Sequence, residues 1–133
     1  MDDIRWQQRF QNYSNAFEKF TLAHTAYTED KNNILFQMAL IQSFEFTFEL
    51  AWKTVKDYLK FKGVDLKLPR EVLKEGFRVG ILKNGQQWIN MMNDRNATSH
   101  TYDDKVVESI ANNIISEYWV LLKELRDYFD SIK

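Results

Sequence analysis

A chain of 133 residues has the size of one domain, and 44% hydrophobic with 15% aromatic residues is enough for a substantial core. Four glycines and one proline are too few for the turns of an all-β domain and favour long helices. The formal net charge of −1 excludes a strongly basic protein that coats nucleic acid by charge alone, but it leaves room for a local phosphate site.

The composition also argues against extracellular and membrane proteins. Cysteine is absent, which excludes disulfides and thiolate metal sites. The first residues contain no apolar signal core, and no apolar run approaches the roughly 20 residues of a membrane span. We therefore expect a soluble, cytoplasmic protein with no membrane contact.

The first predicted helix carries a stripe of aromatic residues that recur by steps of four and three. This is the period of a helix that packs in a bundle. Polar residues 28–33 are expected to end this helix. The members of the stripe are Trp6, Phe10, Tyr13, Phe17, Phe20 and Tyr27.

The second predicted helix, residues 31–61, continues the same alternation and ends before Gly63, a typical C-terminal glycine. Glu45 interrupts its apolar stripe, where a lone buried carboxylate would be costly. Two interpretations stay open. The stripe drifts around the helix so that Glu45 reaches solvent, or Glu45, with Glu49 one turn later, pairs with a cation near Arg95. The apolar members are Ile34, Met38, Ile41, Phe48, Trp52, Val55 and Leu59.

Three further helices complete the predicted fold. A short one begins at Pro69 and ends near Gly80, a fourth begins near Gln86, and the last starts after Asp103 and runs almost to Lys133. We therefore predict an all-α, up-and-down bundle of about four main helices plus one short helix, in a single domain spanning residues 1–133. The short helix carries Val72, Leu73, Phe77 and Val79, and the fourth carries Trp88, Ile89 and Met92.

A polar segment, residues 93–104, separates the last two helices and contains Arg95 and His100. On an unbroken helix, side chains five residues apart diverge by about 140°. They converge only if the helix loosens near residues 98–101, where serine and threonine favour caps and turns. Thr101 or Asp103 would then cap the last helix.

These residue types suit the cleavage of RNA by its own 2′-hydroxyl. Arg95 can hold a phosphate with two hydrogen bonds, His100 can transfer a proton near neutral pH, and Asn96 can orient a ribose or phosphate oxygen. This chemistry needs no metal or other cofactor, and we expect none. An Arg–His pair in a helical connection is common, so a structural or merely exposed role stays open.

The motif also carries a family resemblance. Arg95, His100 and Tyr102 match the arginine, four residues, histidine, one residue, tyrosine pattern of HEPN domains. Together with residues 44–53 (FEFTFELAWK) and 94–102 (DRNATSHTY), they make the chain resemble the nucleotidyltransferase substrate-binding family. These are the HepT-like toxin partners of minimal nucleotidyltransferases, and the resemblance covers nearly the whole chain.

The resemblance implies a helical bundle that forms a homodimer, in which Arg95 and His100 meet their copies across the two-fold axis. Members are metal-independent ribonucleases or inactive relatives. Their partner is a small nucleotidyltransferase that can silence the toxin by adding nucleotides to the motif tyrosine, here Tyr102. The residue can instead be an ordinary tyrosine packed on the end of the bundle.

Two functions follow from the motif and the resemblance. In the first, the chain is the toxin of a toxin–antitoxin pair and an endoribonuclease: Arg95 binds the scissile phosphate, His100 acts as base or acid, and Asn96 assists. In the second, it is a non-catalytic subunit that presents a nucleotide, or itself, to a nucleotidyltransferase. The motif favours the first function, whereas the near-neutral net charge counts against an avid RNA binder.

Overall fold

The computed structural model describes residues 2–99 and 103–133, and all regular secondary structure in those ranges is helical. Two long helices, α1 (Asp2–Glu29) and α2 (Ile34–Phe61), are followed by the short α3 (Pro69–Arg78) and by α4 (Gly85–Thr98). The last helix has three consecutive parts: α5 (Asp104–Asn113), the π-helical turn η1 (Ile114–Tyr118) and α6 (Trp119–Ile132). Within the described ranges this makes four main helices and one short helix, which confirms the predicted all-α bundle.

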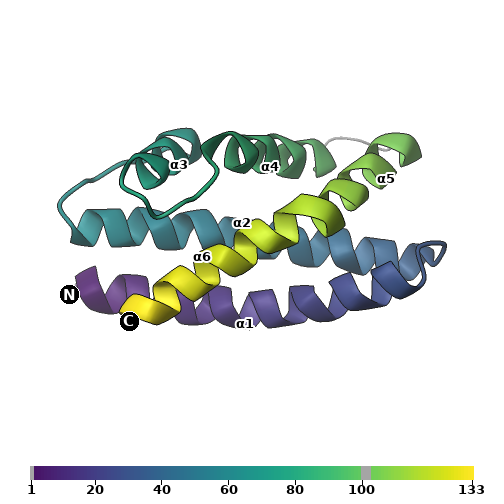
Figure 1. The fold of residues 1–133 in the computed structure, drawn as a ribbon, viewed down its shortest axis with the longest axis horizontal. Helices are drawn as coiled ribbons and strands as arrows, with labels where there is room; N and C mark the ends of the chain where they lie inside the picture. Colours follow the sequence, from purple (N-terminus) through teal and green to yellow (C-terminus); the bar gives the residue numbers. More distant parts are fainter. Residues whose placement is uncertain (1, 100–102) are drawn as a thin grey trace.

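Helix α2 lies at the centre of the arrangement (Figure 1). It runs between α1 on one side and the row formed by α3 and α4 on the other, while α6 crosses the bundle diagonally. It contacts α1, α3, α4, α5 and α6. The main helices run in alternating directions, so the end of α4 comes beside the middle of α2.

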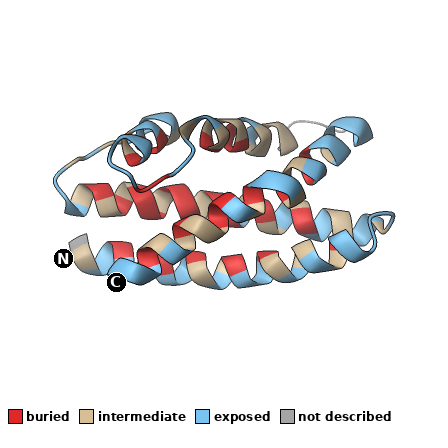
Figure 2. Cartoon of the chain, viewed as in Figure 1, coloured by how far each residue is buried: buried red, intermediate tan, exposed pale blue. Residues whose placement is uncertain are grey.

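The core is rich in aromatic rings. Every member of the predicted α1 stripe is buried, and Figure 2 shows buried positions recurring along the inward side of each helix. Edge-to-face, tilted and stacked ring pairs connect the helices, and such pairs stabilise by about 0.5–1.5 kcal/mol beyond the burial of their area. They include Trp6 with Tyr58 and Phe129, Phe20 with Phe44, Phe44 with Tyr118, and Phe48 with Trp88.

Helix α2 is delimited by side-chain and backbone caps. The Asn33 side chain accepts hydrogen bonds from the backbone N–H groups of Leu35 (3.0 Å) and Phe36 (3.2 Å), so the helix begins after Asn33 and not near Lys31 as predicted. At the other end Gly63 has a φ of +98°, and the Val64 N–H donates to the Leu59 carbonyl at 2.9 Å. This confirms the predicted C-terminal glycine.

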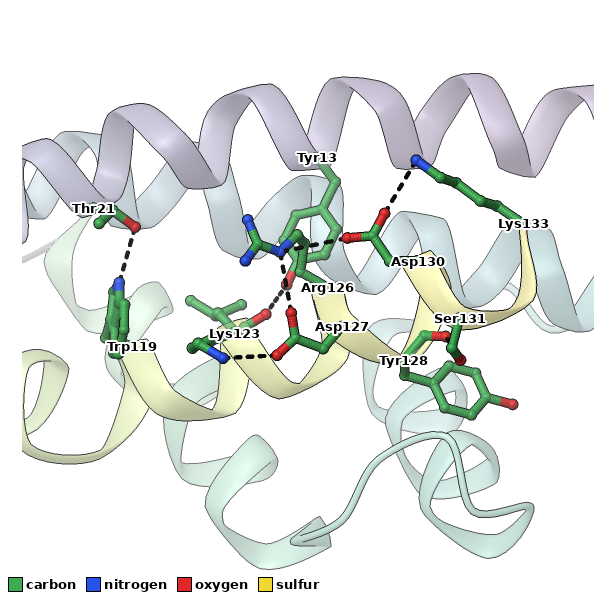
Figure 3. A network of polar contacts seen from close by, with 11 residues as sticks. Tyr13, Thr21, Trp119, Lys123, Arg126, Asp127, Tyr128, Asp130, Ser131 and Lys133 are labelled. Atoms are coloured by element: carbon green, nitrogen blue, oxygen red, sulfur yellow. Dashed lines mark hydrogen bonds and ion pairs between the residues drawn. The ribbon is translucent and has the colours of Figure 1, made fainter.

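Polar contacts attach the last helix to α1 (Figure 3). The Tyr13 hydroxyl donates to the Leu122 carbonyl, and Trp119 Nε1 donates to Thr21 Oγ1 at 3.0 Å. The Arg126 guanidinium lies 4.9 Å from the centre of the Phe17 ring. Because Tyr13 is buried, its pKa is raised well above the usual value. These contacts fix the direction of α6 and η1 across the bundle.

Several residues predicted for the core are exposed. Ile34 and Met38, at the N-terminal end of the α2 stripe, are 61% and 60% exposed, and about half of Phe77 and Val79 is exposed. The α2 stripe drifts because a straight helix does not keep a seven-residue repeat on one face. No described helix of this chain covers the exposed part of that stripe.

The expectation that no segment approaches the length and apolar character of a membrane span does not hold for α2. By length and composition alone this helix is apolar enough to cross a membrane, and less than a third of its most apolar stretch is buried. Core helices of soluble proteins meet the same criterion, and α2 packs against five other helical segments. The criterion therefore does not establish a membrane span, but it draws attention to the uncovered face of α2.

Candidate functional site

Arg95 lies in the last turn of α4 and reaches across to two carboxylates on α2. Its Nη1 is 3.5 Å from Glu45 Oε2, and its Nε is 3.1 Å from Glu49 Oε1. The side chain is only 22% exposed. Glu45 and Glu49 can both reach it because residues four apart lie on the same face of a helix. The structure thus places the predicted carboxylates against the predicted cation.

The contacts of Arg95 leave part of its guanidinium available. Nη1 donates to Ser99 Oγ at 2.6 Å. The Nε–H points away from the direction that a hydrogen bond to Glu49 requires, so that contact is an ion pair only. Nη2 donates no hydrogen bond to any described residue. Among the described residues nothing takes up this donor, so an incoming phosphate oxygen could accept from it.

Glu45 is neither buried alone nor extended into solvent. Its Oε2 accepts a hydrogen bond from Thr98 Oγ1 at 2.7 Å and a longer one from Ser99 Oγ at 3.4 Å. Thr98 Oγ1 also lies 2.7 Å from the Arg95 carbonyl oxygen, and its single proton serves one of the two acceptors at a time. These contacts hold the end of α4 against α2, so the drift of the stripe does not carry Glu45 away from the bundle.

Glu49 has partners on its own helix as well. Trp52 Nε1 donates to Glu49 Oε2 at 3.1 Å, and Lys53 Nζ lies 4.0 Å from the same oxygen. Two carboxylates therefore face Arg95, and Lys53 is the next cation along the helix. The carboxylates orient the guanidinium, but they also offset its charge, so a phosphate at this position must compete with them.

The remaining motif residues are less closely tied to Arg95. Asn96 is exposed, and its side chain makes no hydrogen bond with the described residues. His100, Thr101 and Tyr102 lie outside the described residues, so the predictions for them stay predictions. Helix α4 ends at Thr98, and the Asp103 side chain caps α5 by accepting from the Lys105 N–H at 2.9 Å. A helix break falls where the sequence predicted it.

On another side of α4, Asp94 forms a contact that sequence reasoning missed. Its Oδ2 accepts hydrogen bonds from Tyr118 at 2.5 Å and from Asn113 Nδ2 at 3.1 Å. Burial, and then the Asp94 carboxylate, raise the pKa of Tyr118 far above the usual value. The sequence showed Tyr118 only as a core residue. A buried tyrosine usually finds a partner for its hydroxyl, which was the one available signal.

Asp94 and Tyr118 border a polar pocket of about 400 Å³ between α4 and η1. Within the described part of the chain, no group of three or more histidine, aspartate or glutamate side chains is placed to hold a metal ion. The pocket is also lined by Gln87, Asn90, Asn93, Asn113 and Glu117.

The chain is similar to several known proteins. A Haemophilus influenzae protein named probable ribonuclease HepT is 30% identical over 94 residues, which span 65% of this chain and 64% of that protein. A solved Haemophilus influenzae structure, described as the substrate binding domain of a nucleotidyltransferase, is 22% identical with a TM-score of 0.78, covering 91% of this chain and 98% of the other.

A third relative shares the fold at low identity. It is the tri-AMPylated Shewanella oneidensis HEPN toxin, solved in complex with the MNT antitoxin. Its identity is 9% and its TM-score 0.75, and the match covers 95% of this chain and 96% of the other. Residues 8–131 match the sequence model of the family described as nucleotidyltransferase substrate binding protein like. The chain therefore belongs to this HepT-like family of HEPN and nucleotidyltransferase substrate-binding proteins.

Proposed function

We propose that this chain is the toxin of a toxin–antitoxin pair and a metal-independent endoribonuclease. The observation that carries the proposal is the position of Arg95, which two carboxylates orient at the end of α4, five residues before His100 in the sequence. Membership of the family supports it, as does the relative named as a probable ribonuclease.

The proposed reaction uses the 2′-hydroxyl of the RNA as the nucleophile. His100 takes the proton from this hydroxyl, whose oxygen attacks the adjacent phosphorus. Arg95 stabilises the negative charge that gathers on the phosphate oxygens, and Asn96 helps to orient the strand. The bond to the 5′-oxygen breaks, and that oxygen takes up a proton. The products are a 2′,3′-cyclic phosphate and a 5′-hydroxyl end.

We further infer a homodimer in which two copies of Arg95 and His100 share one cleft. The exposed apolar residues of α2 lie on the N-terminal side of Glu45. A groove of about 360 Å³ at this position is lined by Met38, Ile41, Glu45 and Val107. A second copy would bury this face from the same direction. Light scattering at micromolar concentration should give a dimer, and a monomer would refute the assembly.

A second function has one observation in its favour. Because Glu45 and Glu49 already offset the charge of Arg95, the chain suits a non-catalytic subunit that presents a nucleotide, or itself, to a small nucleotidyltransferase. Both functions include that partner. Incubation with the cognate enzyme and a nucleotide should add mass to the wild type and not to Tyr102→Phe. An equal gain of mass in the wild type and in Tyr102→Phe would show that a residue other than Tyr102 is modified.

Expression in bacteria separates the two functions. We expect the chain alone to arrest growth, and we expect Arg95→Ala and His100→Ala to abolish the arrest at equal protein level. Lys19→Ala, at an exposed position of α1, is the matched control and should remain toxic. A chain that is harmless alone, yet still modified by its partner, would favour the non-catalytic subunit.

A further inference from the structure

The near-neutral net charge is the sum of a basic segment and an acidic remainder of the chain. Residues 53–83 contain nine lysines and arginines against four aspartates and glutamates, a net charge of +5. The rest of the chain contains nine against fifteen, a net charge of −6. The carboxylate of Asp57, one of the four, is buried and paired with Arg9 of α1 at 3.0 Å. The end of α2 and all of α3 therefore form a basic region of an otherwise acidic protein.

Three lysines of this region form a row on α2. Lys53, Lys56 and Lys60 follow Glu49 by steps of four, three and four residues, so they share the face that holds Arg95. The row starts one helical turn beyond Glu49. It extends for about 10 Å along the axis, at 1.5 Å per residue. We call these three residues the lysine row.

The lysine row makes few ion pairs. Lys53 makes only a long ion pair with Glu49, at 4.0 Å. Lys56 and Lys60 make no ion pair with any described residue. The pKa of Asp65 is lowered first by a hydrogen bond from Lys67 and then also by the charges of these two lysines. Arg70 and Lys74 of α3 are exposed and also lack an ion pair with the described residues. Helix α3 packs beside this half of α2 (Figure 1), where a Cβ added at Gly76 would lie 3.2 Å from Val55. Their charges therefore add to the potential of the same end of the bundle.

Aromatic rings also lie near the C-terminal end of α2, but on a different face of the helix from the lysine row. Lys62 sits 5.7 Å from the ring centre of Tyr58 and 5.6 Å from that of Phe61, and Phe61 is 40% exposed. Tyr58 packs against Trp6 of α1 and Phe129 of α6, so these rings do not form a stacking surface along the row. The chain thus provides the proposed phosphate-binding arginine at the end of α4 and a row of lysines on the adjoining face of α2.

We propose that the lysine row binds the phosphate backbone of a single RNA strand beside the Arg95 cleft. The inference rests on the proposed ribonuclease function, and it supplies what that site lacks. Glu45 and Glu49 repel a polyanion near Arg95, so the affinity for RNA has to come from cations outside their reach. The row begins where those carboxylates end and continues in line with them.

The binding should depend strongly on salt. Each phosphate that a lysine neutralises on a single strand changes the slope of log K against log salt by about −0.7, so three lysines account for a slope of about −2. Between 50 and 200 mM salt this corresponds to about a 20-fold loss of affinity. Contacts with bases alone would give a much weaker dependence.

The test measures the affinity of the full-length chain for a fluorescent 12-nucleotide 2′-O-methyl RNA, which retains the phosphates but lacks the nucleophile. One variant combines Lys53→Gln, Lys56→Gln and Lys60→Gln. Its control combines Arg5→Gln, Lys19→Gln and Lys31→Gln, which removes the same charge from exposed positions outside the basic region. Circular dichroism and thermal melting establish that both variants fold.

We expect the lysine-row variant to lose at least 10-fold in affinity at 50 mM salt and about 2 units of salt slope, and the control to lose much less. On cleavable RNA the variant should raise KM and leave kcat nearly unchanged. Equal affinity of the two variants for the oligonucleotide would overturn the inference, as would no binding by the wild type. Unchanged affinity combined with lost binding to the nucleotidyltransferase would assign the row to that protein instead.

The same experiments distinguish the inference from the proposed function. If RNA is cleaved and the lysine-row variant has the KM of the control, the ribonuclease function stands and the inference fails. If the oligonucleotide binds through the lysine row but no RNA is cleaved, the inference about binding stands and the ribonuclease function fails.

Discussion

At the scale of single residues, Glu45 shows what a charged position in an apolar stripe can indicate. The sequence marked it as an exception and offered a cation as its partner, and the structure pairs it with Arg95. The additional contacts of Thr98 and Ser99 with the same carboxylate could not be predicted. They depend on the residue at which α4 ends, because a shift of one residue there would turn different side chains toward α2.

Replacement of Glu45 by alanine should lower the free energy of unfolding by about 1 kcal/mol. The change removes a partly exposed ion pair and leaves the Thr98 hydroxyl without this acceptor. Urea denaturation measures the effect. Glu108→Ala is the control, because Glu108 is exposed on α5 and has no ion pair with the described residues. Equal stability of the two variants would contradict the proposed support of Arg95 by Glu45.

The buried tyrosines predict a loss of stability at alkaline pH. The pKa values of Tyr13 and Tyr118 are raised in the folded protein, mainly by burial, whereas unfolded tyrosine loses its proton near pH 10. Above that pH the folded state holds more protons than the unfolded state, so the free energy of unfolding falls as pH rises.

Urea titrations at pH 9 and pH 11 check this prediction, with Tyr13→Phe as the comparison. The variant should be about 1 kcal/mol less stable at pH 9, because the hydrogen bond to the Leu122 carbonyl is lost. Its stability should then fall less between the two pH values than that of the wild type. An equally steep fall in both would show that Tyr13 does not contribute.

At the scale of elements, helix existence followed from periodicity, and helix ends followed from local chemistry where a cap was visible. Gly63 was recognised as a capping position and Asp103 as one of two candidates, whereas Asn33 was not recognised, which put the start of α2 too early. The π-helical turn at Ile114–Tyr118 could not be predicted. It retains the apolar spacing and contains no proline or glycine. The Asp94–Tyr118 contact, which lies at this turn, was missed for the same reason.

The C-terminal glycine of α2 gives a prediction at this scale. Gly63 has a φ of +98°, and an added Cβ would meet nothing within 4 Å, so its replacement strains only the backbone. Gly63→Ala should cost about 1 kcal/mol in the free energy of unfolding, and Gly63→Asn should cost less, because asparagine tolerates the left-handed region. Thermal melting of both variants checks the order. A more stable Gly63→Ala would contradict it.

At the scale of the whole molecule, the bundle was predictable from the sequence. Six aromatic residues at helical spacing in the first helix, together with few turn residues, leave little choice of architecture. The character of the surface was not predictable in the same way. Ile34 and Met38 were assigned to the core, since periodicity does not tell a face that meets another helix of the chain from one left uncovered. The total charge likewise concealed the basic region at residues 53–83, which becomes meaningful only beside Arg95.

The most direct measurement of the central claim is the analysis of RNA cleavage products by mass spectrometry, with excess EDTA and three proteins: wild type, Arg95→Ala and the control Lys19→Ala. We predict 2′,3′-cyclic phosphate and 5′-hydroxyl ends from the wild type and the control, and a rate at least about 100-fold lower for Arg95→Ala, the loss typical of removing one group that stabilises transition-state charge. Cleavage that requires a metal and leaves 5′-phosphate ends, or an equal rate for Arg95→Ala, would contradict it.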